Sequence, residues 1–204
     1  MSTELTKLTE LQADALIEIL NIGVGHAANS LSQIVGEGVS LSIPRLEILD
    51  SSQIEELSSM ISSKRICPVS QDFSGFIDTR AFLVFPEGKS MDVVRRMLGE
   101  NIGIGDLGEM EQEALSEIGN IILNSCISAM SDSLQSSFQS TLPVFHRGSI
   151  DNVLISENHF VLIMLHINFA IPSDRIDGNL IFLLSATSFN GLAAKIDDFI
   201  QAIS

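Results

Sequence analysis

The chain has 204 residues, of which 45% are hydrophobic, so it can bury a substantial core in one large domain or two small ones. Its 26 acidic and 11 basic residues give a net charge of −15. Because no lysine or arginine cluster exceeds a pair, the composition argues against binding to nucleic acid or to an anionic membrane surface.

The first nine residues are polar and lack the apolar core of a signal peptide, so we expect a cytoplasmic protein. The longest apolar run, at about 160–171, is broken by His166 and Asn168 and is too short to cross a bilayer. It predicts a buried strand and no membrane insertion. Cys67 and Cys126 lack CxxC spacing, and we expect both thiols to be reduced and buried.

The first predicted helix covers about residues 11–35. Thr9 and Gln12 match the pattern of a capping box at its start, and Gly36 is typical of a helix end. Apolar residues recur along one side with helical spacing, which predicts a helix packed against a core. On the polar side, the small residue Gly25 would let another molecule come close.

The polar side of this helix carries an acidic stripe that ends in an amide. Asp14, Glu18 and Asn21 share one face, because spacings of four and seven residues return to the same side of a helix. The stripe recurs ninety-nine residues later, on a second predicted helix at about 107–136, as Glu113, Glu117 and Asn120.

The remaining elements are short. In the first half we expect a strand at 38–49 interrupted by Pro44, a helix at 52–62, strands at 65–72 and 74–85, and a helix at 90–98. In the second half we expect strands at 138–147, 150–156, 159–170 and 174–185, and a helix from Thr187 or Ser188 to about 202. Residues 101–105 read as a linker, and Asp106 with Glu109 as a capping box.

The two halves of the chain match at a constant offset of ninety-nine residues, which the two asparagines, two prolines and two apolar runs share. The offset predicts an internal duplication, with a single domain over 1–204 built from two repeats of about 10–100 and 109–199. Short connections favour antiparallel pairing. We therefore predict a pseudo-two-fold α/β (α+β) fold, a mainly antiparallel sheet with two long helices on one face.

A single Glu-x-x-Asn on a helix surface is usually no more than solvated polar residues. Here the pattern occurs twice at matched positions, and asparagine is unfavourable inside helices, so we infer that the amides are used. An amide can hold and orient a water molecule without titrating, as phosphoryl transfer requires. A metal-dependent hydrolase would need ligands that the chain does not group together.

The two stripes resemble the motif of the CheC/CheX/FliY phosphatases of bacterial chemotaxis, in which Asp or Ser, Glu, Asn and Pro follow at fixed spacing. The matching residues are Asp14, Glu18, Asn21 and Pro44 in the first copy and Glu113, Glu117, Asn120 and Pro143 in the second. Glu113 departs from the usual Asp or Ser. Two copies resemble CheC more than the single-motif CheX, and the chain ends without the C-terminal flagellar-switch domain of FliY.

The resemblance implies a CheC-like hydrolase, a CheY-P phosphatase that removes the aspartyl phosphate of a CheY-like response regulator in two-component signalling. Asn21 and Asn120 would orient the attacking water, while Glu18 and Glu117 would bind the active-site lysine of the receiver. The protein would need no cofactor of its own, because the receiver would supply Mg²⁺. The alternative is a non-catalytic adaptor that binds receivers or a CheD-like deamidase.

Other patterns carry less weight. Glycine pairs at 23–25 and 103–105 resemble fragments of a dinucleotide loop, but neither follows a strand and opens a helix. His159 and His166 are seven residues apart, so they would point to opposite faces of a strand and could not share a metal ion. The methionines at 91, 110 and 130 are expected in the core.

Overall fold

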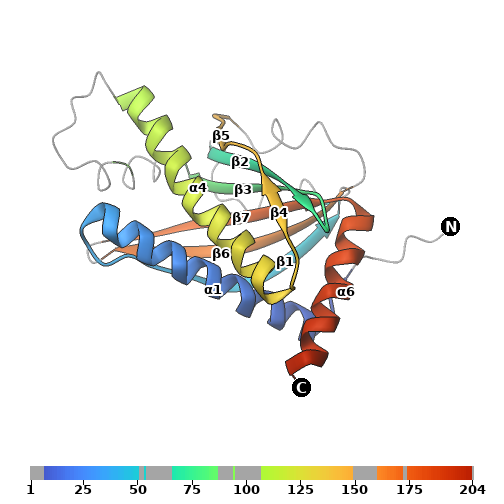
Figure 1. The fold of residues 1–204 in the computed structure, drawn as a ribbon. Helices are drawn as coiled ribbons and strands as arrows, with labels where there is room; N and C mark the ends of the chain where they lie inside the picture. Colours follow the sequence, from blue (N-terminus) through green and yellow to red (C-terminus); the bar gives the residue numbers. More distant parts are fainter. Residues whose placement is uncertain are drawn as a thin grey trace.

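The structure, a computed structural model, describes residues 7–50, 53, 66–86, 94, 107–148, 160–171 and 174–203. These ranges hold three helices and seven strands (Figure 1). In chain order they are α1 (Glu10–Val35), β1 (Ser40–Asp50), β2 (Ile66–Gly75), β3 (Thr79–Pro86), α4 (Leu107–Ser133), β4 (Phe138–Ser140), β5 (Val144–Phe145), β6 (Val161–Ile171), β7 (Asp174–Leu184) and α6 (Ala186–Ile203).

The ends of α1 are those that its sequence predicts. Thr9 Oγ1 accepts from the Gln12 amide at 3.2 Å and Gln12 Oε1 accepts from the Thr9 amide at 2.8 Å, which completes the capping box. The helix ends at Gly36, whose φ of 73° lies in the left-handed region that glycine adopts without strain.

The start of α6 differs from the prediction of a cap at residue 187 or 188. Ser185 precedes the helix, and its hydroxyl accepts from the Ser188 amide at 3.0 Å. Because this bond already satisfies an amide of the first turn, the helix begins at Ala186.

The seven strands form one antiparallel sheet in the order β1-β6-β7-β3-β2-β4, and β5 also pairs with β2. Strands β3 and β7 pair at the centre. On one side β1, from the first half, pairs with the β6–β7 hairpin, and on the other β4 and β5, from the second half, pair with the β2–β3 hairpin. The first strands of each half therefore pair with the hairpin of the other half. Two repeats related by pseudo-two-fold symmetry would pair in this way.

The constant offset does not extend to β2 and β6, the strands that pair with the central β3 and β7. Gly178 pairs with Ile167, so an offset of ninety-nine would pair Thr79 with Pro68, but Thr79 pairs with Phe73. The reason is that the first hairpin turns directly before Thr79, whereas the second continues for four more pairs before its turn. The pairing of β2 therefore departs by five residues from the position that the offset would give it.

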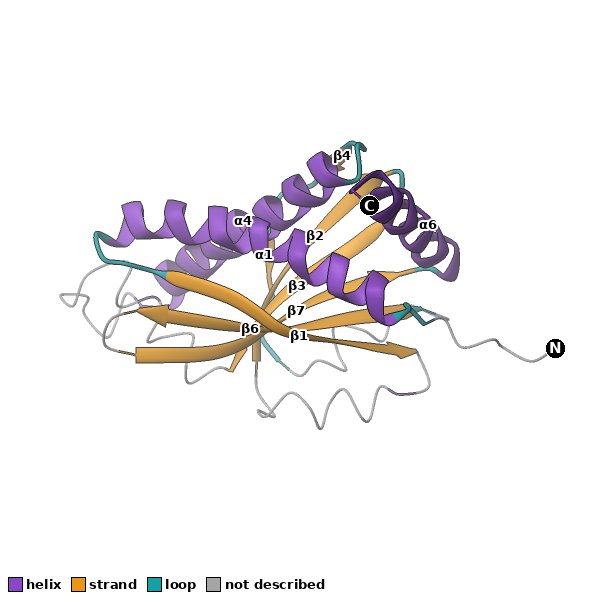
Figure 2. Ribbon diagram, turned by 90° about the horizontal axis from the view of Figure 1, so that it is seen from below, coloured by secondary structure: helices purple, strands orange, loops and turns teal. Residues whose placement is uncertain are grey.

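All three helices lie on one face of the sheet (Figure 2). A large cluster of buried apolar side chains fills the space between them, and a second, smaller cluster lies on the opposite face of the sheet. The predicted fold class, an α+β fold with a mainly antiparallel sheet and two long helices on one face, is thus confirmed, with α6 as a third helix.

Several smaller predictions can also be compared with the structure. The strand predicted at 138–147 is divided into β4 and β5, and α4 ends at Ser133 rather than near 136. Met130 is buried as expected, whereas Met110 is 37% exposed because it lies on the outer side of α4. Other predictions fall largely or wholly outside the described residues and are not compared. They concern the ranges 52–62, 90–98, 101–105 and 150–156 and the residues Asp106, Met91 and His159.

Candidate functional site

The first copy of the motif lies on α1. Asp14 and Glu18 are exposed, while Asn21 is half-buried. The opposite side of the helix is in the core, where residues such as Leu16 and Leu20 are almost fully buried. The amphipathic pattern therefore fixes which face of α1 reaches solvent, and the acidic stripe lies on that face.

The Asn21 side chain is bound to the backbone of β1. Its Nδ2 donates to the carbonyl of Ile43 at 3.2 Å, and its Oδ1 accepts from the amide of Ile43 at 2.9 Å. Because a backbone amide can only donate and a carbonyl can only accept, these two bonds fix which end of the side-chain amide is oxygen. One N–H and one lone pair of Asn21 stay available for another molecule.

Pro44 follows Ile43 within β1, which is an edge strand of the sheet. The pairing of β1 with β6 shifts register between Ser42 and Arg45. Proline lacks the N–H that a regular ladder needs and is tolerated at edges and bulges. Pro44 therefore lies in an edge strand, where the pairing with β6 is irregular and its missing N–H is tolerated.

The second copy lies on α4. Glu113 and Glu117 are exposed and Asn120 is half-buried, as in the first copy. Pro143, however, lies between β4 and β5 rather than inside a strand. The acidic residues and the asparagine of both copies thus lie on helices that cover the same face of the sheet (Figure 2). Each glutamate is exposed and each asparagine is partly covered.

The surroundings of Asn120 differ from those of Asn21. Asn124 Nδ2 lies 2.8 Å from both Asn120 Oδ1 and the Asn120 carbonyl oxygen, and 3.2 Å from Gln71 Oε1. Gln71 Nε2 in turn donates to the carbonyl of Thr141 at 2.7 Å. Within the described part of the chain, Asn120 Nδ2 has no hydrogen-bond partner.

One sequence difference and one difference in burial accompany this asymmetry. Asn124 occupies the position that Gly25 holds in the first copy, and a side chain added at Gly25 would meet no atom within 4 Å. Ile43 is 2% exposed, whereas Leu142, which precedes Pro143, is 84% exposed. The backbone before the proline is thus held in the core in the first half and turned outward in the second.

The two helices make close contact where α1 carries Gly23. A Cβ at this position would lie 2.7 Å from the Cys126 Cα, so only glycine permits this approach. Burial raises the pKa of the Cys126 thiol to about 12, so this group is unreactive at neutral pH. Cys67 is also buried and takes part in no disulfide, in line with the sequence prediction.

An ion pair and a hydrogen bond connect the segment after Pro143 to α4 and β2. Arg147 forms an ion pair of 2.7 Å with the buried Glu111 of α4. His146 Nε2 lies 2.8 Å from Ser70 Oγ, and burial, followed by the positive charge of Arg80, lowers the pKa of this imidazole. These contacts lie beside the second copy of the motif.

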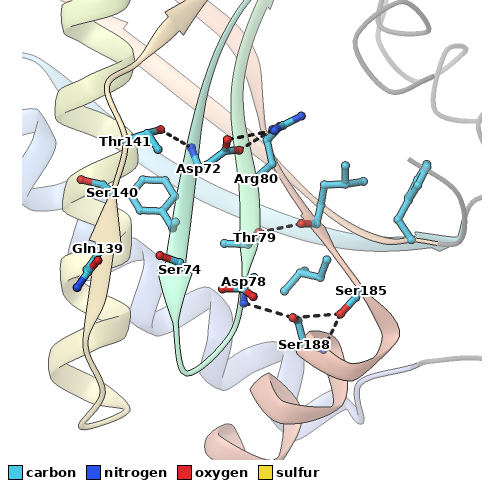
Figure 3. Close-up of a pocket in the computed structure, with 14 residues that line it drawn as sticks. Asp72, Ser74, Asp78, Thr79, Arg80, Gln139, Ser140, Thr141, Ser185 and Ser188 are labelled. Carbon is cyan, nitrogen blue, oxygen red and sulfur yellow. Dashed lines mark hydrogen bonds and ion pairs between the residues drawn. The ribbon is translucent and has the colours of Figure 1, made fainter. Parts of the chain in front are cut away.

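An open cavity of about 550 Å³ lies at the end of the β2–β3 hairpin, between β4 and the start of α6 (Figure 3). Its walls include the ion pair of Asp72 and Arg80 and the side chain of Thr141. No residue of either motif lines it. The cavity is therefore separate from the two candidate sites.

Within the described ranges, no group of three or more His, Cys, Asp or Glu side chains is arranged to hold a metal ion. The described helices also include none that is both long enough and apolar enough to span a membrane. His166 Nε2 lies 2.9 Å from Glu47 Oε1, and Arg45 Nε lies 3.6 Å from the same oxygen.

Sequence reasoning missed Gln71 and Asn124. A second asparagine one helical turn after Asn120 is itself a signal, because asparagine is unfavourable in a helix interior. Gln71 is 2% exposed within β2, and a buried amide of this kind needs partners. Neither signal names the partner, since that depends on how α4 lies across β2.

Comparison with known proteins finds similarity both to curated proteins and to solved structures. No protein-family profile matches the chain. The CheY-P phosphatase CheC of Bacillus subtilis (strain 168) is 30% identical over 131 residues, which cover 61% of this chain. The match also spans 61% of the length of that relative.

The solved structures share the fold. Thermotoga maritima FliY has a TM-score of 0.75 at 18% identity, with 94% of this chain and 98% of that chain covered. Helicobacter pylori FliM, solved in a complex with SpeE, has a TM-score of 0.72 at 14% identity, with 94% and 97% covered. CheX of Desulfovibrio desulfuricans has a TM-score of 0.55 at 19% identity, with 83% and 100% covered. The resemblance to the CheC/CheX/FliY proteins is thus confirmed, by sequence in CheC and by fold in FliY and CheX.

Proposed function

We propose that this protein is a phosphatase that hydrolyses the aspartyl phosphate of a CheY-like receiver domain in chemotaxis or related two-component signalling. The observation that carries the proposal is the pair of matched sites on α1 and α4. Each presents an exposed glutamate one turn before an asparagine whose side-chain amide is held in a fixed orientation. The similarity to CheC supports the same reaction.

The reaction suits groups of this kind. Water attacks phosphorus, the bond from phosphorus to the aspartyl oxygen breaks, and the products are inorganic phosphate and the free carboxylate. The transition state depends on positioning more than on acid–base chemistry. Asn21 and Asn120 would hold the attacking water in line with the leaving oxygen, because an amide can both donate and accept without changing its charge.

The partner completes the site. Glu18 and Glu117 are exposed carboxylates that would pair with the active-site lysine of the receiver, and the receiver would carry the Mg²⁺. Asp14, Glu113, Pro44 and Pro143 would support the site without contacting the reacting atoms. The exposed acidic stripes and the net charge of −15 favour a partner that presents a basic group.

The decisive experiment measures phosphate release from phosphorylated, Mg²⁺-loaded CheY-like receivers with and without this protein. The wild type should accelerate release, and the Asn21→Ala/Asn120→Ala double variant should return the rate to that of the receiver alone. Loss of positioning is worth tenfold or far more in rate. Receiver binding, measured separately, should stay nearly unchanged. Wild-type turnover by the double variant would refute the mechanism.

The two glutamates should behave differently from the asparagines. Glu18→Gln/Glu117→Gln removes two charges that would pair with lysine, so we expect weaker receiver binding, by about tenfold at low salt, and a smaller effect at high salt. Titration of a labelled receiver at two ionic strengths measures this loss. Unchanged affinity at low salt would remove the proposed contact with lysine.

The second candidate is a non-catalytic adaptor that binds receivers or a CheD-like deamidase through the same helix faces. It is favoured by the fold shared with FliM, which has been solved in complexes with SpeE and with FliG. Both functions predict binding. Only the phosphatase predicts that the asparagines affect the rate of phosphate release while leaving affinity intact.

A further inference from the structure

We propose that Asn124 and Gln71 are positioning residues of the second site, where they form a relay that orients the side-chain amide of Asn120. The relay runs from the Thr141 carbonyl through Gln71 and Asn124 to Asn120. This inference rests on the phosphatase function proposed above. The sequence motif contains neither residue.

The relay starts at a fixed point of the backbone. The Thr141 amide donates to the Asp72 carbonyl at 3.0 Å, and the Asp72 amide donates to Thr141 Oγ1 at 3.1 Å. Figure 3 shows Thr141 beside Asp72, whose carboxylate is paired with Arg80. A carbonyl oxygen can only accept, so the group of Gln71 that lies 2.7 Å from Thr141 O must be the Nε2 donor.

The orientation then passes along the chain of amides. With Nε2 on Thr141, the Oε1 of Gln71 faces Asn124 at 3.2 Å. The facing atom of Asn124 also lies 2.8 Å from the backbone carbonyl of Asn120, so it must be the Nδ2 donor. Its third neighbour, at 2.8 Å, is therefore the Oδ1 of Asn120. The orientation of each side-chain amide thus determines the orientation of the next one. As a result, the Nδ2 of Asn120 points away from the relay.

Burial makes this orientation firm. Gln71 is only 2% exposed, and leaving a buried amide without partners would cost about 1–3 kcal/mol. Hydrogen-bond networks in a site of low polarity are correspondingly strong and rigid. An Asn120 that flipped its amide would place an N–H against the Asn124 N–H and lose this bond, so the relay holds Asn120 ready for the receiver.

The first site has no such relay and provides an internal contrast. Gly25 stands at the position of Asn124, and the Ile43 backbone orients Asn21 directly. Removing the Asn124 amide should therefore affect only turnover that depends on Asn120. A change that merely destabilised the fold would affect both sites.

The test uses the full chain in the Asn21→Ala background, where turnover depends on the second site. Asn124→Ala should lower the rate constant for phosphate release at saturating phosphorylated receiver by roughly tenfold, because small misplacements of a positioning group have effects of this size or more. The receiver concentration for half-maximal rate should change less than twofold. Asn124→Asp, which keeps the shape but loses the N–H donors, should show the same loss.

Two controls separate the relay from simple destabilisation. Asn190→Ala, the same change at an exposed asparagine of α6 outside both motifs, should leave turnover unchanged. Once Asn120 is replaced by alanine and Asn21 is intact, Asn124→Ala should add no further loss, which is the signature of coupling between neighbouring residues. Thermal unfolding of every variant confirms that it is folded.

The outcomes are distinct. Full turnover of Asn124→Ala in the Asn21→Ala background would overturn the relay while leaving the phosphatase intact. Equal losses with and without Asn120 would also overturn it, because the effect would then be structural. Absence of any Asn120-dependent turnover in the starting background would instead point to failure of the proposed function at the second site.

Discussion

The two motif-bearing regions of this protein have nearly the same sequence pattern but different hydrogen bonds. In the first, Asn21 bonds to both backbone groups of Ile43, a core residue of β1. In the second, the equivalent Leu142 is exposed to solvent. The side-chain amides of Asn124 and Gln71 orient Asn120 instead. The comparison teaches that an asparagine on a helix can be oriented directly by a strand or indirectly by side chains.

The largest expected difference between the halves is in stability. Ile43→Ala should lower the free energy of unfolding by about 3 kcal/mol, because it leaves a cavity in the core. Leu142→Ala should change the free energy by less than about 0.5 kcal/mol, because this side chain is already in water. Urea unfolding of the two variants measures the contrast. Equal losses would mean that the halves do not differ in the way described.

The next difference concerns activity. Asn21 has already used one N–H and one lone pair on Ile43, whereas Asn120 has a free Nδ2 among the described residues. Because the two sites contribute additively, we expect Asn120→Ala to lower receiver dephosphorylation by roughly threefold and Asn21→Ala by only about 1.5-fold. Initial rates at matched receiver concentrations give the two numbers. The opposite order would show that the bonds to Ile43 help catalysis more than they restrict it.

The smallest effect is a dependence of stability on pH that arises at His146, in the second half. Burial and the nearby Arg80 lower the pKa of His146 below its ordinary value of 6.5. The unfolded chain then binds a proton at a pH where the folded chain does not, so stability falls as the pH drops below about 6.5. His146→Gln should flatten the unfolding free energy between pH 7 and pH 5. An unchanged slope would exclude His146 as its source.

The sequence predicted the main elements because their signals are local and strong. The polar and apolar sides of residues 11–35 determine a surface helix with its back on a core, and the capping box fixes where it starts. The duplication predicted a pseudo-two-fold antiparallel sheet, and the sheet found has the exchanged pairing that such symmetry produces. The spacing of Glu18 and Asn21 was enough to predict that they share one face of the helix.

The errors came from long-range effects. The offset of ninety-nine residues gave no warning that β2 pairs with β3 five residues away from the position expected by analogy with the second hairpin. Turn placement depends on which residues both strands can bury, and this is a property of the assembled sheet. Similarly, Met110 was expected in the core because methionine is usually buried, but its place on α4 faces outward.

The sequence by itself determined the fold class, the two helix-borne motifs and the exposure of their glutamates, because helical periodicity decides which side chains share a face. Only the tertiary structure decided what each asparagine touches. Asn21 meets the Ile43 backbone twenty-two residues away, and Asn120 is oriented through Gln71, a strand residue forty-nine positions earlier. Such contacts depend on the packing of helix against sheet, and no local pattern in the chain specifies them.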